Sequence, residues 1–150
     1  FTQLNGKLFV AATTETFGTE LYVGNLTSAG SASLAIAATS ANKNEGNTAS
    51  TAFTFTVTRS GTLTGTTTVN YAVTGIGATP AMANDFIGNV LPTGQVTFAA
   101  GQTSRVITIR VRGDLTAELD ERFIVTLSNA SIGSTIATAI AAGLIRNDDL

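Results

Sequence analysis

The chain contains no cysteine and no histidine among its 150 residues. Without cysteine, it can form neither a disulfide nor a thiolate metal site. Without histidine, it lacks the commonest general base and the commonest ligand of transition metals. Charged residues are also scarce, because eight basic and ten acidic residues make up 12% of the chain and give a net charge of −2. The few basic residues are scattered, which argues against nucleic-acid binding.

Long apolar runs are missing as well. No run reaches the roughly 18 residues that a membrane-spanning helix needs. The first residues, Phe1 to Leu4, lack a basic region followed by an apolar stretch, so we expect no signal peptide and either a processed chain or a segment of a longer one. An apolar fraction of 43% is still enough to build the core of one ordinary domain.

What the sequence does contain is a persistent alternation of apolar and polar residues, which is typical of β-strands. Residues 53–58 place phenylalanine and valine on one face and threonine on the other, and residues 69–73 repeat the pattern. Threonine favours strands because its branched Cβ restricts the first side-chain torsion. Ile107 interrupts the alternation of its strand, which allows a bulge there. We therefore predict strands over 33–38, 53–58, 69–73, 95–98, 104–112, 123–127 and 135–146.

Seven strands with one apolar face each predict an all-β fold, a seven-stranded immunoglobulin-like two-sheet sandwich. One sheet closed on itself is the alternative. On the apolar face we expect five aromatic core residues, namely Phe53, Phe55, Tyr71, Phe98 and Phe123.

The first 30 residues differ from the rest of the chain. Lys7 to Ala11 and Glu20 to Val23 predict two short strands that form a hairpin. An isolated hairpin is marginally stable in water, so we expect it to pack on this domain, an upstream domain or a neighbouring molecule. The small polar residues from Gly24 to Ser33 predict a linker. We therefore predict an N-terminal extension over 1–30 and a sandwich domain over 31–150.

Acidic residues concentrate in one stretch, where four carboxylates lie among the eight residues from Asp114 to Glu121. Loops that follow alternate strands of a sandwich emerge at the same end, so we expect other acidic residues to join them. Carboxylates gathered there repel one another by roughly several kcal/mol unless a cation or water disperses the charge. Calcium fits this chemistry because it takes 6–8 oxygen ligands. Zinc and copper do not, since histidine and cysteine are absent.

A series of segments within residues 33–149 resembles the Calx-beta domain, the module named for sodium–calcium exchangers and found in integrin β4 and many bacterial surface proteins. In chain order the segments are Asn44–Asn47, Phe53–Gly61, Val69–Ala72, Asn84–Phe86, Gly94–Ser104, Asp114–Phe123, Val125–Asn129 and Ile145–Asp149. The resemblance implies a calcium-binding sandwich whose ligands lie at one end. The ligands that it implies are Glu45, Asp85, Asp114, Glu118, Glu121, Asp148 and Asp149, with the carbonyl of Thr116 as a further one.

The chain departs from the Calx-beta pattern at one position, and its first 30 residues resemble another family. Binding members of the family often carry two acidic residues before the central loop, and this chain has Gly113 at the first of these positions, which implies fewer or weaker ions. Residues 1–30 resemble short ELWxxDGT-like bacterial repeats through Glu20-Leu21-Tyr22-Val23.

The predicted function is a non-catalytic, calcium-binding structural or adhesive module of a secreted or cell-surface protein. Its expected partners are neighbouring domains, copies of the same protein, the extracellular matrix or another surface protein. One alternative is a filament subunit that uses residues 1–24 for strand addition with little calcium dependence. A second is a regulatory calcium sensor. The simplest alternative for the acidic loop is a solvated turn without an ion, and for Asp148–Asp149 it is a frayed terminus or the start of a linker.

Overall fold

The computed structural model describes residues 2–4, 7–14, 18–25 and 30–150. Contacts between Cα atoms divide the chain into two compact units, residues 1–30 and residues 31–150. Within the described residues, no helix has both the length and the apolar composition needed to cross a bilayer.

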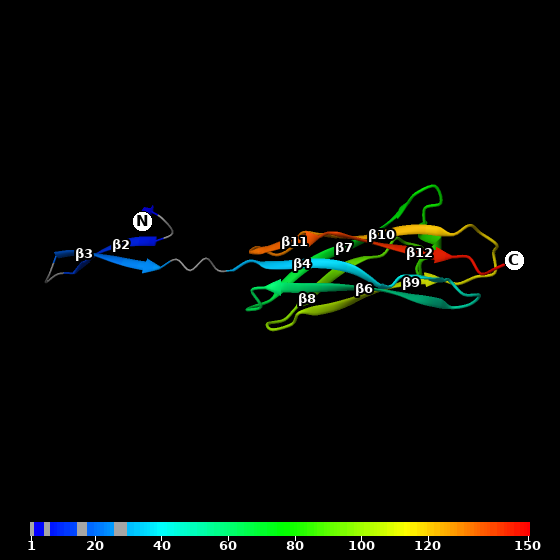
Figure 1. Cartoon of the computed structure of the whole chain (residues 1–150), viewed down its shortest axis with the longest axis horizontal. Helices are drawn as coiled ribbons and strands as arrows, with labels where there is room; N and C mark the ends of the chain where they lie inside the picture. The colour runs from blue at the N-terminus through cyan, green and yellow to red at the C-terminus, as the bar shows by residue number, and fades with distance from the viewer. Residues whose placement is uncertain (1, 5–6, 15–17, 26–29) are drawn as a thin grey trace. The chain divides into compact units, whose positions relative to one another are not determined.

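Residues 31–150 form a β-sandwich, which confirms the predicted fold class (Figure 1). Its larger sheet has the strand order β5-β12-β10-β7-β8, and its smaller sheet has the order β11-β4-β6-β9. The elements are β4 (Ala32–Ser40), β5 (Asn42–Asn44), β6 (Ser50–Gly61), β7 (Thr67–Ile76), the 3-10 helix η1 (Ala83–Asp85), β8 (Thr93–Phe98), β9 (Ser104–Arg112), β10 (Glu121–Ser128), β11 (Ser134–Thr138) and β12 (Ile140–Arg146).

Nine strands replace the predicted seven because the first and the last strand each switch sheets. The first one breaks at Ala41, so that β4 pairs with β6 in the smaller sheet while β5 pairs with β12 in the larger one. The last one breaks at Ala139, whose carbonyl accepts a 2.7 Å hydrogen bond from the N–H of Leu127. Both switches produce parallel pairs, β11 with β4 and β12 with β5, whereas the other pairs in the sandwich are antiparallel.

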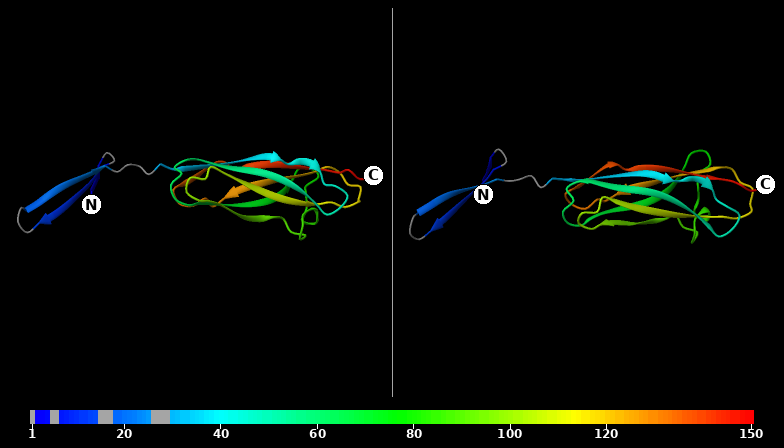
Figure 2. Two further views of the ribbon diagram at one scale, coloured as in Figure 1. Left: turned by 90° about the horizontal axis from the view of Figure 1, so that it is seen from below. Right: turned by 60° about the horizontal axis from the view of Figure 1, so that its bottom comes forward.

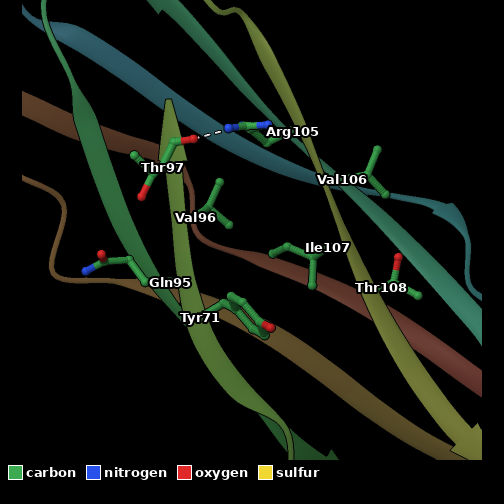
Figure 3. A pocket seen from close by; sticks show the side chains of 8 residues that line it. All are labelled: Tyr71, Gln95, Val96, Thr97, Arg105, Val106, Ile107 and Thr108. Carbon is green, nitrogen blue, oxygen red and sulfur yellow. Dashed lines mark hydrogen bonds between the residues drawn. The ribbon is translucent and has the colours of Figure 1, made fainter. Parts of the chain in front are cut away.

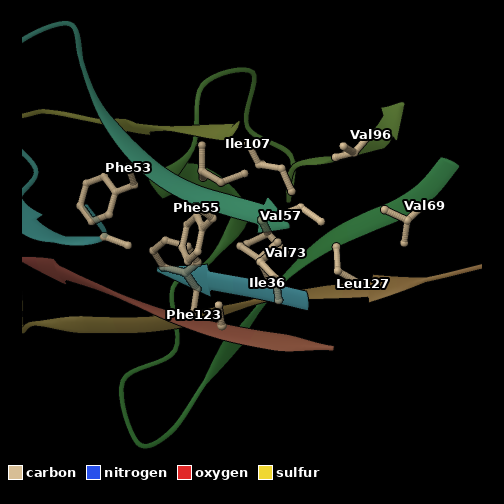
Figure 4. Packing of buried hydrophobic residues seen from close by; sticks show 14 of the residues in the cluster. Ile36, Phe53, Phe55, Val57, Val69, Val73, Val96, Ile107, Phe123 and Leu127 are labelled. Atoms are coloured by element: carbon tan, nitrogen blue, oxygen red, sulfur yellow. The ribbon is translucent and has the colours of Figure 1, made fainter. Parts of the chain in front are cut away.

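The core lies between the two sheets and contains the phenylalanines that the alternation predicts (Figure 4). Phe53, Phe55, Phe98 and Phe123 are fully buried, while Tyr71 is half-buried at the rim. The ring of Phe123 packs against three others, with centroid distances of 5.9 Å to Phe53, 5.9 Å to Phe55 and 5.6 Å to Phe86. Burying each of these rings contributes about 1.5–3 kcal/mol to folding.

The bulge that the sequence allows at Ile107 is absent from β9. The β6–β9 register continues without a shift from Thr58↔Ser104 to Ser50↔Arg112. Ile107 is 3% exposed and Val106 is 62% exposed, so the core face of β9 starts one residue later than the alternation suggests. Alternation alone does not decide whether Val106 or Ile107 faces the core. Here Ile107 shares its face with the buried Ile109 and Val111.

The N-terminal unit contains the predicted hairpin, in which β2 (Lys7–Thr14) and β3 (Gly18–Asn25) are antiparallel. A short strand, β1 (Thr2–Leu4), pairs with β2 and makes a three-stranded sheet with β2 in the middle. Of the predicted linker, Gly24 and Asn25 belong to β3 and Ala32 begins β4, while residues 26–29 lie outside the described part of the chain.

Candidate metal centre

Four segments gather at one end of the sandwich, here called the acidic end (Figures 1 and 2). They are the β5–β6 loop over 45–49, the helix η1, the β9–β10 loop over 113–120 and the C-terminal residues 147–150. Hydrogen bonds tie the C-terminal residues to the β5–β6 loop and to the β9–β10 loop. Gly46 N donates to Asp148 Oδ1 at 3.1 Å, and Glu118 N donates to Asn147 Oδ1 at 3.1 Å.

Carboxylates at the acidic end fall into two groups of three. In each group the three residues offer oxygen atoms that all lie within 4.8 Å of one another. The first cluster consists of Glu45, Asp148 and Asp149, and the second consists of Asp85, Glu118 and Glu121.

Backbone hydrogen bonds position the first cluster. Glu45 follows β5, and its N–H donates to the carbonyl of Arg146 at 3.1 Å, which holds it beside the end of β12. The side chain of Glu45 is buried, and so is that of Asp149, which is only 9% exposed. Asp149 Oδ1 accepts a hydrogen bond from the amide of Asn47, whereas Asp149 Oδ2 is buried without any hydrogen-bond partner. A buried, unpaired carboxylate oxygen is costly unless a cation supplies the missing partner.

The second cluster is built around η1. Asp85 is buried, and its carboxylate accepts hydrogen bonds from Met82 N and from Asn84 Nδ2, the latter at 3.0 Å. The next residue, Phe86, is buried against Phe123, which anchors this part of the long β7–β8 connection in the core. Glu121 opens β10, two residues before that same phenylalanine. The core therefore fixes two of the three carboxylates of this cluster.

The crowding of carboxylates perturbs their proton affinities. Burial, followed by repulsion from Asp114 and Glu118, raises the pKa of Glu45 to about 7. Burial, followed by a hydrogen bond that the protonated Glu121 carboxyl donates to the Asp85 carboxylate, raises the pKa of Glu121 to about 8. Burial and the charge of Asp85 also raise the pKa of Glu118. Some of these groups therefore hold protons near neutral pH unless a cation balances their charge.

Two of the predicted ligands lie outside both clusters. Asp114 is half-buried, and its Oδ1 accepts a 2.7 Å hydrogen bond from Thr116 N, which lowers the pKa of Asp114. This contact makes a local turn, which is a common role for aspartate in loops. Asp114 is nevertheless close enough to the first cluster to raise the pKa of Glu45. Thr116 contacts Asp114 through its N–H, whereas the predicted ligand group is the Thr116 carbonyl.

Three polar residues outside the predicted ligand set hold the clustered segments in place. Asn47 holds Asp149, and Asn147 accepts from Glu118 N and donates to the Asp149 carbonyl at 2.8 Å. Asp120 Oδ1 accepts from Asn147 N at 3.2 Å, so it braces the loop rather than joining a cluster. The signal for these roles is weak, since asparagine and aspartate next to strand ends are typical of ordinary turns.

Gly113 stands where the resemblance led us to expect a further acidic residue. A Cβ at this position would lie 2.1 Å from the carbonyl oxygen of Gly46 and 3.1 Å from Thr48 N. The β5–β6 loop therefore passes directly over the backbone of residue 113. Any side chain here, acidic or not, would push that loop away from the first cluster.

Two depressions in the described surface of the sandwich contain no carboxylate. One, of about 350 Å³, lies between the edge strands β8 and β9 and is lined by Tyr71, Val96 and Ile107 among others (Figure 3). Arg105 spans it by donating to the Thr97 carbonyl at 2.8 Å. The other, of about 610 Å³, lies where β4 passes into β5 beside Arg122 and β12. Neither resembles the oxygen-rich acidic end.

The donor set of both clusters consists of oxygen atoms, which suits a hard cation such as calcium and does not suit the softer metals that prefer nitrogen or sulfur. The residues available to hold an ion are Glu45, Asp148 and Asp149 in one cluster and Asp85, Glu118 and Glu121 in the other. The orphaned oxygen of Asp149 fits this use.

Comparisons with known proteins identify the family and agree with the fold. The family model described as the Calx-beta domain matches residues 31–149. A solved structure described as the apo-form Calx CBD1 domain is 25% identical and superposes with a TM-score of 0.64, over 79% of this chain and 99% of that one. No curated protein sequence matches the chain significantly.

Two further solved structures are longer than this chain. One is described as CBD12 from CALX1.2, with 25% identity, a TM-score of 0.63 and coverage of 78% of this chain and 46% of that one. The other is described as calcium binding domain CBD12 of CALX1.1, with 24% identity, a TM-score of 0.58 and coverage of 76% and 44%. The chain thus spans less than half the length of either.

Proposed function

The chain belongs to the Calx-beta domain family, and from this premise we propose that its sandwich is a calcium-binding module whose ions lie at the acidic end. The first cluster and the second cluster would each hold an ion through three carboxylates. Asp114 and the carbonyl of Thr116 are candidates for additional ligands on the exposed side.

One observation carries this proposal. Asp149 Oδ2 is buried beside Glu45 and Asp148 without any hydrogen-bond donor. A divalent ion would supply the missing partner and would also offset the repulsion that raises the pKa of Glu45. Calcium is the best candidate, since it accepts irregular cages of oxygen ligands, and one structural neighbour is described as a calcium binding domain.

We place this module in a secreted or cell-surface protein, where it serves as a non-catalytic spacer or adhesive unit. Support comes from a chain with few charges and without histidine or cysteine, which leaves it poor in the usual catalytic groups. Its partners in this view are neighbouring domains, further copies, the extracellular matrix or another surface protein.

A filament joined by strand addition is the alternative that a specific observation favours. Within its own unit, β3 is an edge strand of eight residues, and such edges can pair with a strand of another molecule. Size-exclusion chromatography with light scattering tests this alternative, because filament formation predicts assemblies that disappear when residues 1–24 are removed. A monodisperse monomer at all concentrations contradicts it.

Thermal unfolding with calcium tests the main proposal. We expect millimolar calcium to raise the melting temperature and a chelator to reverse the rise, because a ligand at about 100 times its Kd adds about 2.7 kcal/mol. For a domain of this size that corresponds to a shift of about 5–10 °C. An unchanged melting curve, together with no heat of calcium binding by calorimetry, would refute the proposal.

A further inference from the structure

The β9–β10 loop exposes two large apolar side chains among its carboxylates. Leu115 is 73% exposed and Leu119 is 72% exposed, although this is the most acidic stretch of the chain. Met82, three residues before Asp85, is exposed as well. Single exposed leucines are common on protein surfaces, whereas exposed apolar residues that occur together, as these do beside the carboxylates, are typical of an interaction surface.

The shape of this surface favours a deformable partner. Leu115 and Leu119 stand on a loop, and the two depressions described above are lined by other residues. A protruding apolar side chain without a neighbouring groove inserts readily into a soft apolar layer. The boundary between lipid headgroups and acyl chains is such a layer, and apolar residues enter it to a depth of about 5–10 Å.

The negative charge of this surface makes docking on an anionic partner depend on a bound cation. The acidic end holds eight of the ten acidic residues, so without a cation it repels any anionic surface. Each cluster brings together three carboxylates, and some of their oxygen atoms already accept hydrogen bonds from the protein, whereas calcium takes 6–8 oxygen ligands. Positions in the coordination sphere therefore remain for oxygen atoms from outside the protein, and phosphate oxygens of lipid headgroups are suitable ligands.

We propose that the acidic end docks on anionic lipid bilayers when calcium is bound, with Leu115 and Leu119 inserted between the headgroups and the ions bridging to lipid phosphates. This proposal rests on the calcium binding proposed above. The ion removes the electrostatic repulsion, and the two leucines supply the apolar contact. Each contribution alone is too small for stable attachment, so both are required.

Vesicle co-sedimentation of the full chain tests the proposal. We expect the protein to pellet with vesicles of phosphatidylcholine and phosphatidylserine in calcium, and to stay in solution with chelator or with phosphatidylcholine alone. The double variant Leu115→Ser/Leu119→Ser should lose about tenfold or more in vesicle affinity and should keep the calcium-induced rise in melting temperature. The matched control is Ile132→Ser, which removes a fully exposed apolar side chain from the β10–β11 turn. It should pellet like the parent.

A reporter variant adds a direct measurement. The chain contains no tryptophan, so Leu115→Trp introduces a single one. Its fluorescence should shift to shorter wavelength only when calcium and anionic vesicles are both present, as expected for a ring that enters the bilayer interface.

The outcomes separate this proposal from the one on which it rests. A calcium-induced rise in melting temperature without pelleting, or pelleting that the leucine variant leaves unchanged, overturns the bilayer proposal and leaves calcium binding intact. Calcium-dependent dimers that need the same leucines, seen by sedimentation velocity without lipid, overturn it in favour of a second copy. Absence of any calcium effect on melting, together with no heat of calcium binding by calorimetry, overturns both.

Discussion

The backbone N–H of Gly46 donates a 3.1 Å hydrogen bond to Oδ1 of Asp148, although the two residues lie 102 positions apart in the chain. This bond fastens the C-terminal residues to the β5–β6 loop and leaves Asp148 Oδ2 for other partners. With the Asn47–Asp149 contact, it holds the carboxylates of the first cluster close together despite their repulsion. These hydrogen bonds thus hold together like charges that a cation would offset.

The variant Asp149→Asn tests the first cluster. Removing one of three like charges should stabilise the metal-free protein by about 1 kcal/mol and should weaken calcium binding roughly tenfold. Thermal unfolding in chelator and in calcium measures both effects. The variant should have a higher melting temperature in chelator and a smaller calcium-induced rise. Asp120→Asn is the matched control, because it removes a charge near the same site but keeps the oxygen that accepts from Asn147 N. A lower calcium affinity in the control than in Asp149→Asn would contradict the assignment.

The stability of the metal-free protein should fall as pH rises. Glu45 has a pKa of about 7 and Glu121 of about 8 in the folded protein, both above the ordinary value of 4.5. Between about pH 5 and pH 8 the native state thus binds more protons than the unfolded state, and raising the pH costs stability. We expect a loss of about 2 kcal/mol, after allowing for solvent screening at this partly exposed end. Urea titrations in chelator across this range measure it.

Calcium should flatten this pH dependence. An ion that binds the ionised carboxylates replaces the protons, so calcium affinity should increase from pH 5 to pH 8 and binding should release protons. Calorimetry in buffers with different ionisation enthalpies counts these protons. An affinity that is constant over this range would contradict the participation of Glu45 and Glu121.

Arg59 should stabilise the fold without affecting the site. It is 2% exposed, and it donates to carbonyls from the β6–β7 turn and from the turn after β8, namely Thr62, Gly65 and Ala99. Arg59→Leu should lower the free energy of unfolding by about 2–3 kcal/mol, because it removes the buried guanidinium that donates to these three carbonyls. Arg59→Lys should restore only part of the loss, since lysine lacks the planar fork. The calcium-induced shift in melting temperature should match that of the parent in both variants.

Gly113→Ala should also destabilise the protein. The added Cβ would meet the Gly46 carbonyl at 2.1 Å, so the β5–β6 loop must move, at a cost of about 1–3 kcal/mol. Gly65→Ala is a useful comparison, because its Cβ meets nothing within 4 Å and only its positive φ of 75° opposes alanine. That backbone effect costs about 1 kcal/mol. Only the change at Gly113 should lower calcium affinity.

Much of the fold follows from the sequence because strand faces obey a period of two. The alternation of phenylalanine with threonine over 53–58 identifies the core face, and Phe53 and Phe55 are indeed buried. The sheet switches at Ala41 and Ala139 are not predictable in this way. An alanine has little preference for either sheet, and the outcome depends on pairing with β12 and β10, which are distant in sequence.

The site was predictable to the level of its location. The order of strands places Glu45, Asp85 and Asp149 at one end, as the alternation of loops suggests. The sequence does not reveal the division into two clusters. Whether an acid faces a neighbouring carboxylate or its own backbone depends on local hydrogen bonds, such as the one from Thr116 N to Asp114. The close passage of Gly46 over Gly113 likewise depends on loops that are far apart in sequence.

The parallel pairing of β5 with β12 has a mechanical consequence. The first strand of the sandwich, β4, begins at one end of the domain, and its last strand, β12, finishes at the opposite end (Figure 1). A force that pulls the two ends apart draws β4 and β5 in one direction and β12 in the other. The hydrogen bonds between the parallel strands β5 and β12 are then loaded in shear, so all of them must break at once for the strands to separate. An ion held by Glu45 and Asp149 would join the chain just beyond those two strands. Bound calcium would thereby lock the first and last strands of the sandwich against extension.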